Sequence, residues 1–346
     1  MLNKINAIDL FCGVGGLTKG LSNANINVIA GFDIVNNLKT TYENNNVGAK
    51  YLNKDVSKIK AEDIKKLVAH GKDKFLLAGC APCQPFSTQN KNRKKNTDHR
   101  RTLIYYFANL IRDTSPDFVF MENVPGLEKL EPDMLNYFIK ILNSQGYSWD
   151  KKIVDAASYG TPQHRKRFVL MAAKTSKDIN IPIGSFNGKD KPFKTVKQCI
   201  SHLPKISAGE IHSEVKNHRS AGLSDLNKKR IKATKKSGGG RLDWHPSLWL
   251  ECHKNTAGYK DVYGRIDWNK PSPTLTTRFY GYSCGRYGHP EQDRALSIKE
   301  GALLQTFPND YVFEEGNSME SLGRQIGNAV PPKMAKVFGE YFMSLS

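Results

Sequence analysis

Hydrophobic and polar positions alternate along the first 175 residues in a pattern that predicts a sheet covered by helices. Short apolar runs typical of buried strands are separated by longer stretches with helical spacing, as in the βαβ units of a mostly parallel sheet. The predicted strands are 7–11, 28–32, 75–78, 118–121 and 167–172, and the predicted helices are 17–23, 38–44, 61–70, 102–113 and 134–144. We therefore expect an α/β domain over residues 1–175.

The pattern changes after residue 175. Pro, Gly, Ser and Lys become frequent, the periodicity fades, and segments such as LysSerGlyGlyGly at 236–240 indicate irregular connections. Helical spacing returns at about residue 318. We expect a smaller, irregular second domain over 176–317, followed by a C-terminal helix over 318–346 that returns to the first domain.

Length and composition are those of a folded protein. The chain has 346 residues, of which 39% are hydrophobic and 25% charged, so two domains are expected and a low-complexity class is excluded. The N-terminus lacks the apolar run of a signal peptide, and no long apolar window predicts a membrane span. The six cysteines show no disulfide-scaffold spacing. We expect reduced thiols and a cytoplasmic protein without membrane contact.

The charge is strongly positive and unevenly distributed. The formal net charge is +19, residues 174–270 contain 20 Lys and Arg against 9 Asp and Glu, and residues 84–102 contain 6 against 1. Such a balance favours a polyanionic partner. Solvated basic faces are the alternative interpretation of each segment alone. Two segments that flank the same candidate chemistry favour nucleic acid.

The end of the first predicted strand carries glycines in a pattern typical of nucleotide binding. AspLeuPheCysGlyValGlyGly at 9–16 runs from that strand into a helix, so the backbone turns tightly and can approach a ligand. Asp33 ends the second strand, where a carboxylate can accept hydrogen bonds from ribose hydroxyls. Asp55 is a candidate partner for an adenine amine. These residues alone leave open nicotinamide, S-adenosylmethionine and a glycine turn without a ligand.

Two cysteines follow the next strand, in PheLeuLeuAlaGlyCysAlaProCysGlnProPheSer at 75–87. A redox pair and half of a zinc site are possible interpretations of the CxxC spacing. A zinc site needs a second ligand pair that the sequence lacks, so we expect no metal, and the prolines favour a rigid loop over a redox helix start. Cys83 is the candidate nucleophile and Cys80 a buried small side chain. A thiol needs a cation or a helix dipole to ionise near neutral pH, and Arg165 is a candidate for that role.

At this point the chain resembles the cytosine-5 DNA methyltransferases of prokaryotic restriction-modification systems. The resemblance is carried by AspLeuPheCysGlyValGlyGly, ProCysGln, GluAsnVal, GlnHisArgLysArg and ArgGlnIleGlyAsnAlaVal, which occur here in the family's order. It covers the first domain and the C-terminal tail. It implies a Rossmann-like S-adenosylmethionine-dependent methyltransferase domain with a mostly parallel sheet, plus an irregular target-recognition domain.

The resemblance implies catalytic roles that agree with the chemistry. Carbon 5 of cytosine is a poor nucleophile, and a thiolate added at carbon 6 makes the ring electron-rich. Cys83 matches the family's nucleophile, and Glu122 matches the carboxyl group that stabilises charge at nitrogen 3. Arg165 fits a cation that holds the base oxygen and the thiolate, and Arg167 fits a structural or Glu-orienting partner. Loss of the carbon-5 proton and β-elimination then release Cys83.

The resemblance also assigns the cofactor, S-adenosyl-L-methionine, to named positions. The glycine-loop residues match the family's contacts to the methionine part of the cofactor. Asp33 matches the ribose contact, Asp55 matches the adenine contact, and Asn328 is the residue that the C-terminal tail adds to the same pocket. The expected cofactor-binding residues are Phe11, Gly13, Gly15, Asp33, Ile34, Asp55, Val56, Pro82, Leu103 and Asn328. Many relatives carry Glu where this chain has Asp33, and the shorter carboxylate can serve the same purpose.

Double-stranded DNA is the partner that the resemblance implies, and the target cytosine must be flipped out of the duplex. The segment 84–102 resembles the family's catalytic loop, which closes on DNA; an ordinary surface loop is the alternative. The basic segment from about 175 to 270 resembles the target-recognition region, where Arg and Lys read guanine and most lysines hold phosphates. The candidate DNA-binding residues are Gln84, Ser87, Arg93, Lys94, Lys95, Arg219, Arg230, Arg241 and Arg265.

Three rival functions remain open at this stage. A tRNA cytosine-5 methyltransferase would keep the same nucleophile and pocket, although the long basic segment favours DNA. A binding module without catalysis is disfavoured by Cys83, Glu122 and Arg165, and a dehydrogenase lacks a recognisable hydride-transfer acid. We expect a monomeric, nucleoid-associated modification enzyme, with a cognate restriction endonuclease as a separate partner. The recognition sequence is not predictable from these residues.

Overall fold

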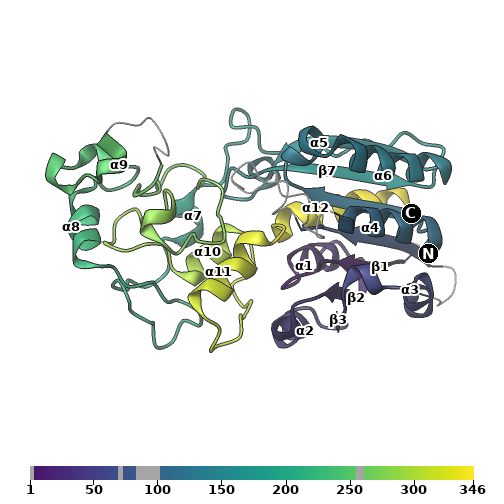
Figure 1. Ribbon diagram of the computed structural model, residues 1–346, viewed down its shortest axis with the longest axis horizontal. Helices are drawn as coiled ribbons and strands as arrows, with labels where there is room; N and C mark the ends of the chain where they lie inside the picture. Colours follow the sequence, from purple (N-terminus) through teal and green to yellow (C-terminus); the bar gives the residue numbers. More distant parts are fainter. Residues whose placement is uncertain (1–3, 69–72, 83–101, 255–260) are drawn as a thin grey trace. The chain divides into compact units, whose positions relative to one another are not determined.

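The computed structural model describes residues 4–68, 73–82, 102–254 and 261–346. The chain divides into two compact units (Figure 1). Unit 1 consists of residues 1–155, 166–184 and 330–346, and unit 2 of residues 156–165 and 185–329. The chain therefore enters unit 2 at residue 156 and returns to unit 1 within the GlnHisArgLysArg motif at 163–167.

Unit 1 is built on a seven-stranded sheet with the order β3-β2-β1-β4-β5-β7-β6. Strands β1 to β5 pair in parallel, whereas β7 runs antiparallel to both β5 and β6. The β1 and β5 strands are buried along their whole length, as expected for strands covered on both faces. The strands are β1 Ile5–Leu10, β2 Asn27–Asp33, β3 Lys50–Asn53, β4 Lys74–Gly79, β5 Phe118–Asn123, β6 Ser148–Asp155 and β7 Lys166–Ala173.

Helices cover both faces of this sheet (Figure 1). Apolar side chains of α3, α4 and α6 share one core with Ile8, Leu10 and Leu77 of the strands. On the other face, Phe338 of α12 packs against Phe120 of β5 with ring centroids 5.5 Å apart. The helices of unit 1 are α1 Gly16–Ser22, α2 Lys39–Asn45, α3 Ala61–Val68, α4 Leu103–Thr114, α5 Gly126–Leu130, α6 Pro132–Ser144 and α12 Pro332–Leu345, with short 3-10 turns at Asn36–Leu38 and Val56–Lys58.

Unit 2 contains short helices joined by irregular segments. Its α-helices are α7 Val196–Ile200, α8 Asp225–Ala233, α9 Glu251–Lys254, α10 Ile298–Leu304 and α11 Met319–Asn328, and its 3-10 turns are Ala156–Tyr159, Arg241–Asp243, Pro246–Leu248 and Tyr282–Cys284. A small apolar core forms around Ile231, Trp244 and Tyr282. Charged groups supplement this core, because Arg294 binds both carboxylate oxygens of buried Glu300 at 2.8 and 2.6 Å.

That buried pair sets the ionisation of its neighbours. Burial alone would raise the pKa of Glu300, but the hydrogen bonds and charge of Arg294 lower it to about 2. Burial also lowers the pKa of His289 to about 4, although its Nε2 lies 3.6 Å from a Glu300 oxygen. At neutral pH unit 2 therefore contains an ionised Arg–Glu pair beside a neutral histidine.

The fold class predicted from the sequence is confirmed, and the differences are local. All five predicted strands and all five predicted helices of the first 175 residues have counterparts within a few residues. The predicted list omits two of the seven strands, β3 and β6. The β3 strand has only four residues, and most residues of β6 are only partly buried or exposed, so neither contains a continuous apolar run. The division into units also differs from the predicted boundaries, since α11 and residues 156–165 belong to unit 2. Long-range contacts, which local spacing does not encode, assign these segments.

Candidate functional site

The loop after β1 has a backbone shaped for close approach to a ligand. Phe11, Gly13 and Gly15 all have positive φ angles, of 61°, 52° and 87°. A Cβ atom at Gly15 would lie 2.4 Å from Asn46 Nδ2, so only glycine fits there, whereas a Cβ atom at Gly13 would meet nothing within 4 Å. The loop is therefore fixed on its inner side and open at Gly13, where an adenosine cofactor can approach the backbone.

Asp33, the last residue of β2, is tied to this loop. Its Oδ2 accepts a hydrogen bond from Gly13 N at 2.9 Å, and its Oδ1 accepts one from Val35 N at 3.1 Å. Burial raises the pKa of Asp33, although these two hydrogen bonds oppose the shift. Each oxygen keeps a second lone pair for a hydroxyl donor. The neighbouring Ile34 is 62% exposed, which suits a side chain that a bound ring would cover.

The remaining predicted cofactor residues of unit 1 follow other strands of the same sheet edge. Asp55 comes just after β3 and caps a short turn by accepting a hydrogen bond from Ser57 N at 2.9 Å. Val56 is buried in the core, and Leu103 begins α4 with its side chain also buried. Because the parallel strands β1 to β4 end at one edge of the sheet, their following residues share that edge, which is where α/β sheets bind ligands.

Asp9 is a residue of this site whose role the sequence did not reveal. Its carboxylate is buried within β1, and Oδ2 accepts a hydrogen bond from Thr18 Oγ1 at 2.7 Å. The same hydroxyl lies 2.8 Å from Tyr42 Oη. Asp9 Oδ1 has no hydrogen-bond partner among the described residues. Burial raises the pKa of Asp9 to about 7, so this carboxyl group titrates near neutral pH. The position of Asp9 in the glycine motif was the available signal.

Glu122 and Arg167 form an ion pair at the end of β5. Arg167 Nε lies 2.9 Å from Glu122 Oε1, and the two side chains are only 12% and 9% exposed. The antiparallel register of β5 and β7, which pairs Glu122 with Val169, brings the two together. The sequence predicted that Arg167 is a structural residue or orients Glu122, and an ion pair between the two is compatible with that prediction. The pairing of β5 with β7 thus holds the Glu122 carboxylate next to the Arg167 guanidinium.

Cys80 lies next to this pair. Burial, with the charge of Glu122 and the more distant charge of Asp9, raises the pKa of the Cys80 thiol well above its usual value. The thiol is therefore protonated at neutral pH and is a hydrogen-bonding neighbour of the Glu122 side chain. The sequence predicted only a buried small side chain here, because no motif spacing links Cys80 to Glu122.

Arg165 is placed differently from the prediction. Its side chain is 2% exposed, with Nη1 3.1 Å from Leu275 O and Nη2 2.9 Å from Gly327 O and 3.2 Å from Ala329 O. Both terminal nitrogens thus bind main-chain carbonyls of unit 2. Three of its five N–H donors are therefore engaged with backbone carbonyls, a structural use that the prediction did not include.

The four arginines expected to read bases are also engaged within unit 2. Arg265 is fully buried and donates to the carbonyls of Thr234, Ile231, His289 and Gln292. Arg230 donates to Leu248 O at 2.9 Å, and Arg241 is 5% exposed. Burial corrects the expectation for Arg230, Arg241 and Arg265, since a buried guanidinium cannot reach a base edge. Half-buried Arg219 donates to Asn317 O.

Several predicted site residues lie outside the described residues, so the structure adds nothing about them. These are the candidate nucleophile and the predicted contacts of the catalytic loop: Cys83, Gln84, Ser87, Arg93, Lys94 and Lys95. Pro82, the last described residue before them, is half-buried. Asn328 is the last residue of α11 and its side chain is exposed.

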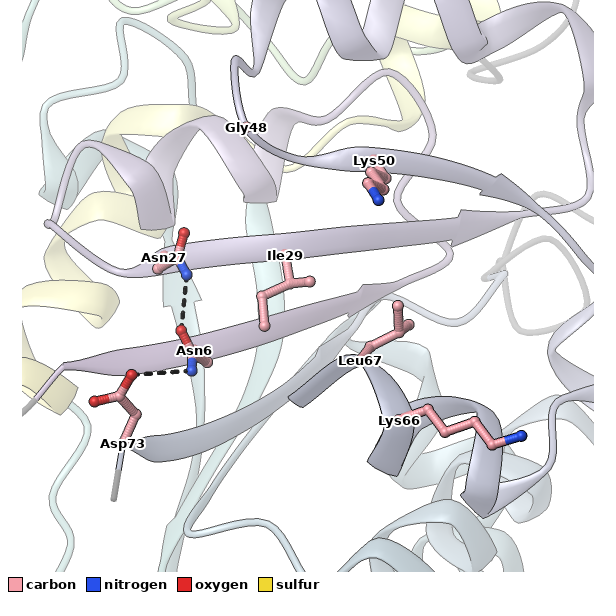
Figure 2. A pocket seen from close by; sticks show the side chains of 8 residues that line it. All are labelled: Asn6, Asn27, Ile29, Gly48, Lys50, Lys66, Leu67 and Asp73. Carbon is pink, nitrogen blue, oxygen red and sulfur yellow. Dashed lines mark hydrogen bonds between the residues drawn. The ribbon is translucent and has the colours of Figure 1, made fainter. Parts of the chain in front are cut away.

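Figure 2 shows an open cavity of about 390 Å³ at the amino ends of β1, β2 and β3. It lies at the sheet edge opposite the glycine loop. Asn6 Oδ1 accepts a hydrogen bond from Asn27 Nδ2 at 2.7 Å, and Asn6 Nδ2 donates to Asp73 at 3.3 Å. Its lining is Asn6, Asn27, Ile29, Gly48, Lys50, Lys66, Leu67 and Asp73. Because these strand-end polar groups bind one another, we assign no ligand to the cavity.

No helix in the described part of the chain combines the length and the hydropathy that crossing a bilayer requires.

Similarity to solved structures supports the fold. A putative DNA modification methyltransferase encoded within a prophage of E. coli superposes with a TM-score of 0.75 at 25% identity, over 99% of this chain and 100% of that chain. A mutant of Spodoptera frugiperda DNMT2 superposes with a TM-score of 0.65 at 16% identity, over 98% and 100%. The second likeness shows the fold alone. The sheet with its covering helices is the Rossmann-like fold of S-adenosylmethionine-dependent methyltransferases.

Sequence relatives identify the family. The chain is 40% identical over 338 residues to the type II methylase M.HgiDII of Herpetosiphon aurantiacus, covering 96% of this chain and 93% of that protein. It is 30% identical over 349 residues to the type II methyltransferase M1.HphI of Haemophilus parahaemolyticus, covering 99% and 88%. The family described as C-5 cytosine-specific DNA methylase matches residues 5–343. The chain therefore belongs to this family of DNA cytosine-5 methyltransferases, whose methyl donor is S-adenosylmethionine.

Proposed function

We propose that this chain is the modification methyltransferase of a type II restriction-modification system and methylates one cytosine within a short duplex motif. Its two similar relatives are named type II enzymes and match it nearly end to end. The observation that carries the chemistry is the buried Glu122–Arg167 pair. Its two residues lie in the neighbouring strands β5 and β7 of the sheet that also holds the glycine loop and Asp33. This arrangement holds the carboxyl group of Glu122 on the sheet whose strand ends are the proposed cofactor site.

The residues of unit 1 fit S-adenosylmethionine. Asp33 offers two carboxylate oxygens to a ribose diol, Gly13 leaves room at the loop, and exposed Ile34 provides an apolar cover. We propose Phe11, Gly13 and Gly15 as methionine contacts and Asp55 as the adenine contact. When bound, the cofactor supplies an electrophilic methyl group on a sulfonium.

In the proposed reaction Cys83 adds as a thiolate to carbon 6 of a flipped cytosine, forming a carbon–sulfur bond and making carbon 5 nucleophilic. Glu122, as the carboxylic acid, donates a hydrogen bond to nitrogen 3, where the ring gathers electron density, and Arg167 holds that carboxyl group in place. Carbon 5 gains the methyl group and then loses its proton to a base. The electrons of the carbon–hydrogen bond re-form the double bond, and the thiolate of Cys83 leaves.

DNA contact is proposed to rest on exposed lysines more than on the buried arginines. Helix α8 and the residues after it present Lys228, Lys229, Lys232 and Lys235 to solvent, and Ser224 caps the helix. Lysines at such positions neutralise phosphates without reading sequence. Arg219 remains a proposed base reader. Together with the basic segment 84–102, these groups would offset the cost of opening the duplex, which is a few kcal/mol.

The remaining assignments follow from a DNA substrate. We propose a monomer that acts on chromosomal DNA in the cytoplasm, with a separate cognate endonuclease cutting the same motif when it is unmethylated. Unit 1 is the proposed catalytic domain and unit 2 the proposed target-recognition domain. A tRNA substrate is not favoured, because the matching family is described as acting on DNA.

Methylation mapping tests this function. The chain would be expressed in a host free of cytosine-5 methylation, and the DNA mapped at base resolution. We expect methylation of one short motif, lost in Cys83→Ala and kept in Cys284→Ala, which removes an exposed thiol of unit 2. Methylation that persists in Cys83→Ala would refute the mechanism. No methylation by folded wild-type protein would refute the DNA substrate and direct the assay to tRNA.

A further inference from the structure

Two carboxyl groups of unit 1, those of Asp9 and Asp33, flank the glycine loop and are called here the acidic pair. Asp9 stands two residues before Phe11 in β1, and Asp33 ends the neighbouring strand β2, where its Oδ2 accepts a hydrogen bond from Gly13 N at 2.9 Å. In the parallel register Asp9 lies opposite Gly31, two residues before Asp33. The two strands that carry the loop thus each place one carboxyl group beside it.

Asp9 is buried and only partly hydrogen bonded. Its side chain is 1% exposed, Oδ2 accepts a hydrogen bond from Thr18 Oγ1 at 2.7 Å, and Oδ1 has no partner among the described residues. An ionised carboxylate can accept about four hydrogen bonds, and its charge is costly to bury without donors or a cation. Ionised Asp9 would therefore be stabilised by a positive charge that binds nearby.

The neighbours of Asp9 in the described part of the chain do not supply that charge. They are Thr18 of α1, Tyr42 of α2, whose Oη lies 2.8 Å from Thr18 Oγ1, the thiols of Cys12 in the loop and Cys80 after β4, and Asp33 of β2. Burial and the charge of Asp9 raise the pKa of both thiols, so these are neutral near pH 7. The lysine of α1, Lys19, donates to Asn45 O at 3.0 Å. The one described charge that acts strongly on Asp9 is the negative charge of Asp33.

S-adenosylmethionine carries a positive sulfonium, whereas its product S-adenosylhomocysteine has an uncharged thioether in the same position. We propose that Asp9 is the residue that makes this site select the charged methyl donor over the uncharged product. Asp9 gives its proton to solvent when the donor binds, and it takes a proton back when methyl transfer removes the sulfonium charge. The inference rests on the proposed cofactor site at the glycine loop and Asp33, and it adds the residue that sets the charge selectivity of that site.

Proton linkage fixes the sign of the effect. Burial raises the pKa of Asp9 to about 7 in the cofactor-free protein, and a nearby cation lowers the pKa of a carboxyl group. Binding of S-adenosylmethionine therefore releases a proton. Its affinity should rise as pH increases up to about 7 and become constant above, whereas the affinity for S-adenosylhomocysteine should change little.

Calorimetric titration of the full chain without DNA measures these affinities at pH 6 and pH 8. We expect the wild type and Asp9→Asn to bind S-adenosylmethionine within about twofold of each other at pH 6, and the wild type to bind it about fivefold or more tightly at pH 8. For S-adenosylhomocysteine the two proteins should agree at both pH values. The amino group of the cofactor also titrates near pH 8, and the comparison of two proteins at one pH cancels that contribution. Asp225→Asn, at a carboxylate that is 93% exposed, is the control and should match the wild type throughout.

A second variant moves the pH dependence without removing the carboxyl group. The hydrogen bond from Thr18 lowers the pKa of Asp9, so Thr18→Val should raise it. The increase in affinity for S-adenosylmethionine should then occur about one pH unit higher than in the wild type. A purely structural role of Thr18 would lower the affinity equally at every pH. This variant keeps the inference testable if Asp9→Asn does not fold.

The results distinguish this inference from the proposed function. A difference between the wild type and Asp9→Asn that is the same at pH 6 and pH 8 would show that Asp9 acts through packing, and would overturn the inference. An equal pH-dependent difference with S-adenosylhomocysteine would overturn the charge selectivity. Wild-type protein that shows the expected pH dependence and methylates no DNA would refute the proposed function and leave the role of Asp9 intact.

Discussion

The buried carboxyl group of Asp9 gives a prediction that links the cofactor loop to stability. Replacing Asp9 by Asn keeps the shape and an acceptor for the Thr18 hydroxyl but removes the charge. Burial raises the pKa of Asp9 from 3.8 to about 7 in the folded protein. The folded state therefore binds a proton that the unfolded state has already lost between these two pH values.

The sign and size of the effect follow from proton linkage. Where the folded state binds more protons than the unfolded state, stability falls as pH rises. Ionisation of Asp9 thus costs nothing below about pH 4, increasingly more up to pH 7, and a constant amount above. The difference between 3.8 and about 7, at 1.36 kcal/mol for each pH unit, gives a penalty of about 4 kcal/mol above pH 7.

Urea unfolding of the cofactor-free protein measures this penalty. The free energy of unfolding of Asp9→Asn minus that of the wild type should increase by about 2 to 3 kcal/mol between pH 5 and pH 8. Taking the difference cancels groups such as His289 and Glu300, which titrate in both proteins. Asp225→Asn, at a carboxylate that is 93% exposed, is the control and should show no such trend. A constant difference for Asp9→Asn across this range would refute the burial argument.

Four further predictions test the site and the fold. Asp33→Asn should weaken S-adenosylmethionine binding at least about tenfold and leave the affinity for duplex DNA nearly unchanged, because a neutral amide cannot accept hydrogen bonds from both ribose hydroxyls. An affinity for the cofactor equal to that of the wild type, measured by calorimetry, would contradict the ribose role. Arg167→Met should lower kcat by about a hundredfold or more and destabilise the fold by about 3 kcal/mol, since it leaves Glu122 buried without its cation. A kcat at saturating substrates that equals the wild-type value would exclude an orienting role. Gly20→Ala should cost about 1 to 3 kcal/mol in urea unfolding, because the new Cβ would lie 2.5 Å from Pro332 O; an unchanged midpoint would show that α1 and α12 can separate freely. DNA affinity should fall steeply with salt in a binding titration, because lysines release condensed counterions from phosphates; a flat response would argue against the exposed lysines as the interface.

Local signals determined much of this protein. Apolar spacing alone predicted the strands and helices of unit 1, since burial on a sheet imposes its period on the sequence. The motifs predicted the family, the methyl donor and the enzyme class, all of which the comparisons confirm. The motifs also predicted that Glu122 and Arg167 belong to one site. The ion pair is compatible with that expectation. Glu122 directly follows the predicted strand 118–121, and Arg167 begins the predicted strand 167–172.

Only the tertiary structure decided how the charged residues are used. Arg165 and Arg167 are two positions apart in one motif, yet Arg167 pairs with Glu122 while Arg165 binds carbonyls up to 164 residues away. The sequence predicts a surface cation at Arg265, but this side chain is fully buried, because carbonyls from two other segments, 231–234 and 289–292, bind its guanidinium. Asp9 acquires its pKa only where β1 and α1 exclude water from it. A sequence records which groups carry charge, and the folded chain determines the partners and the solvent access that give each charge its role.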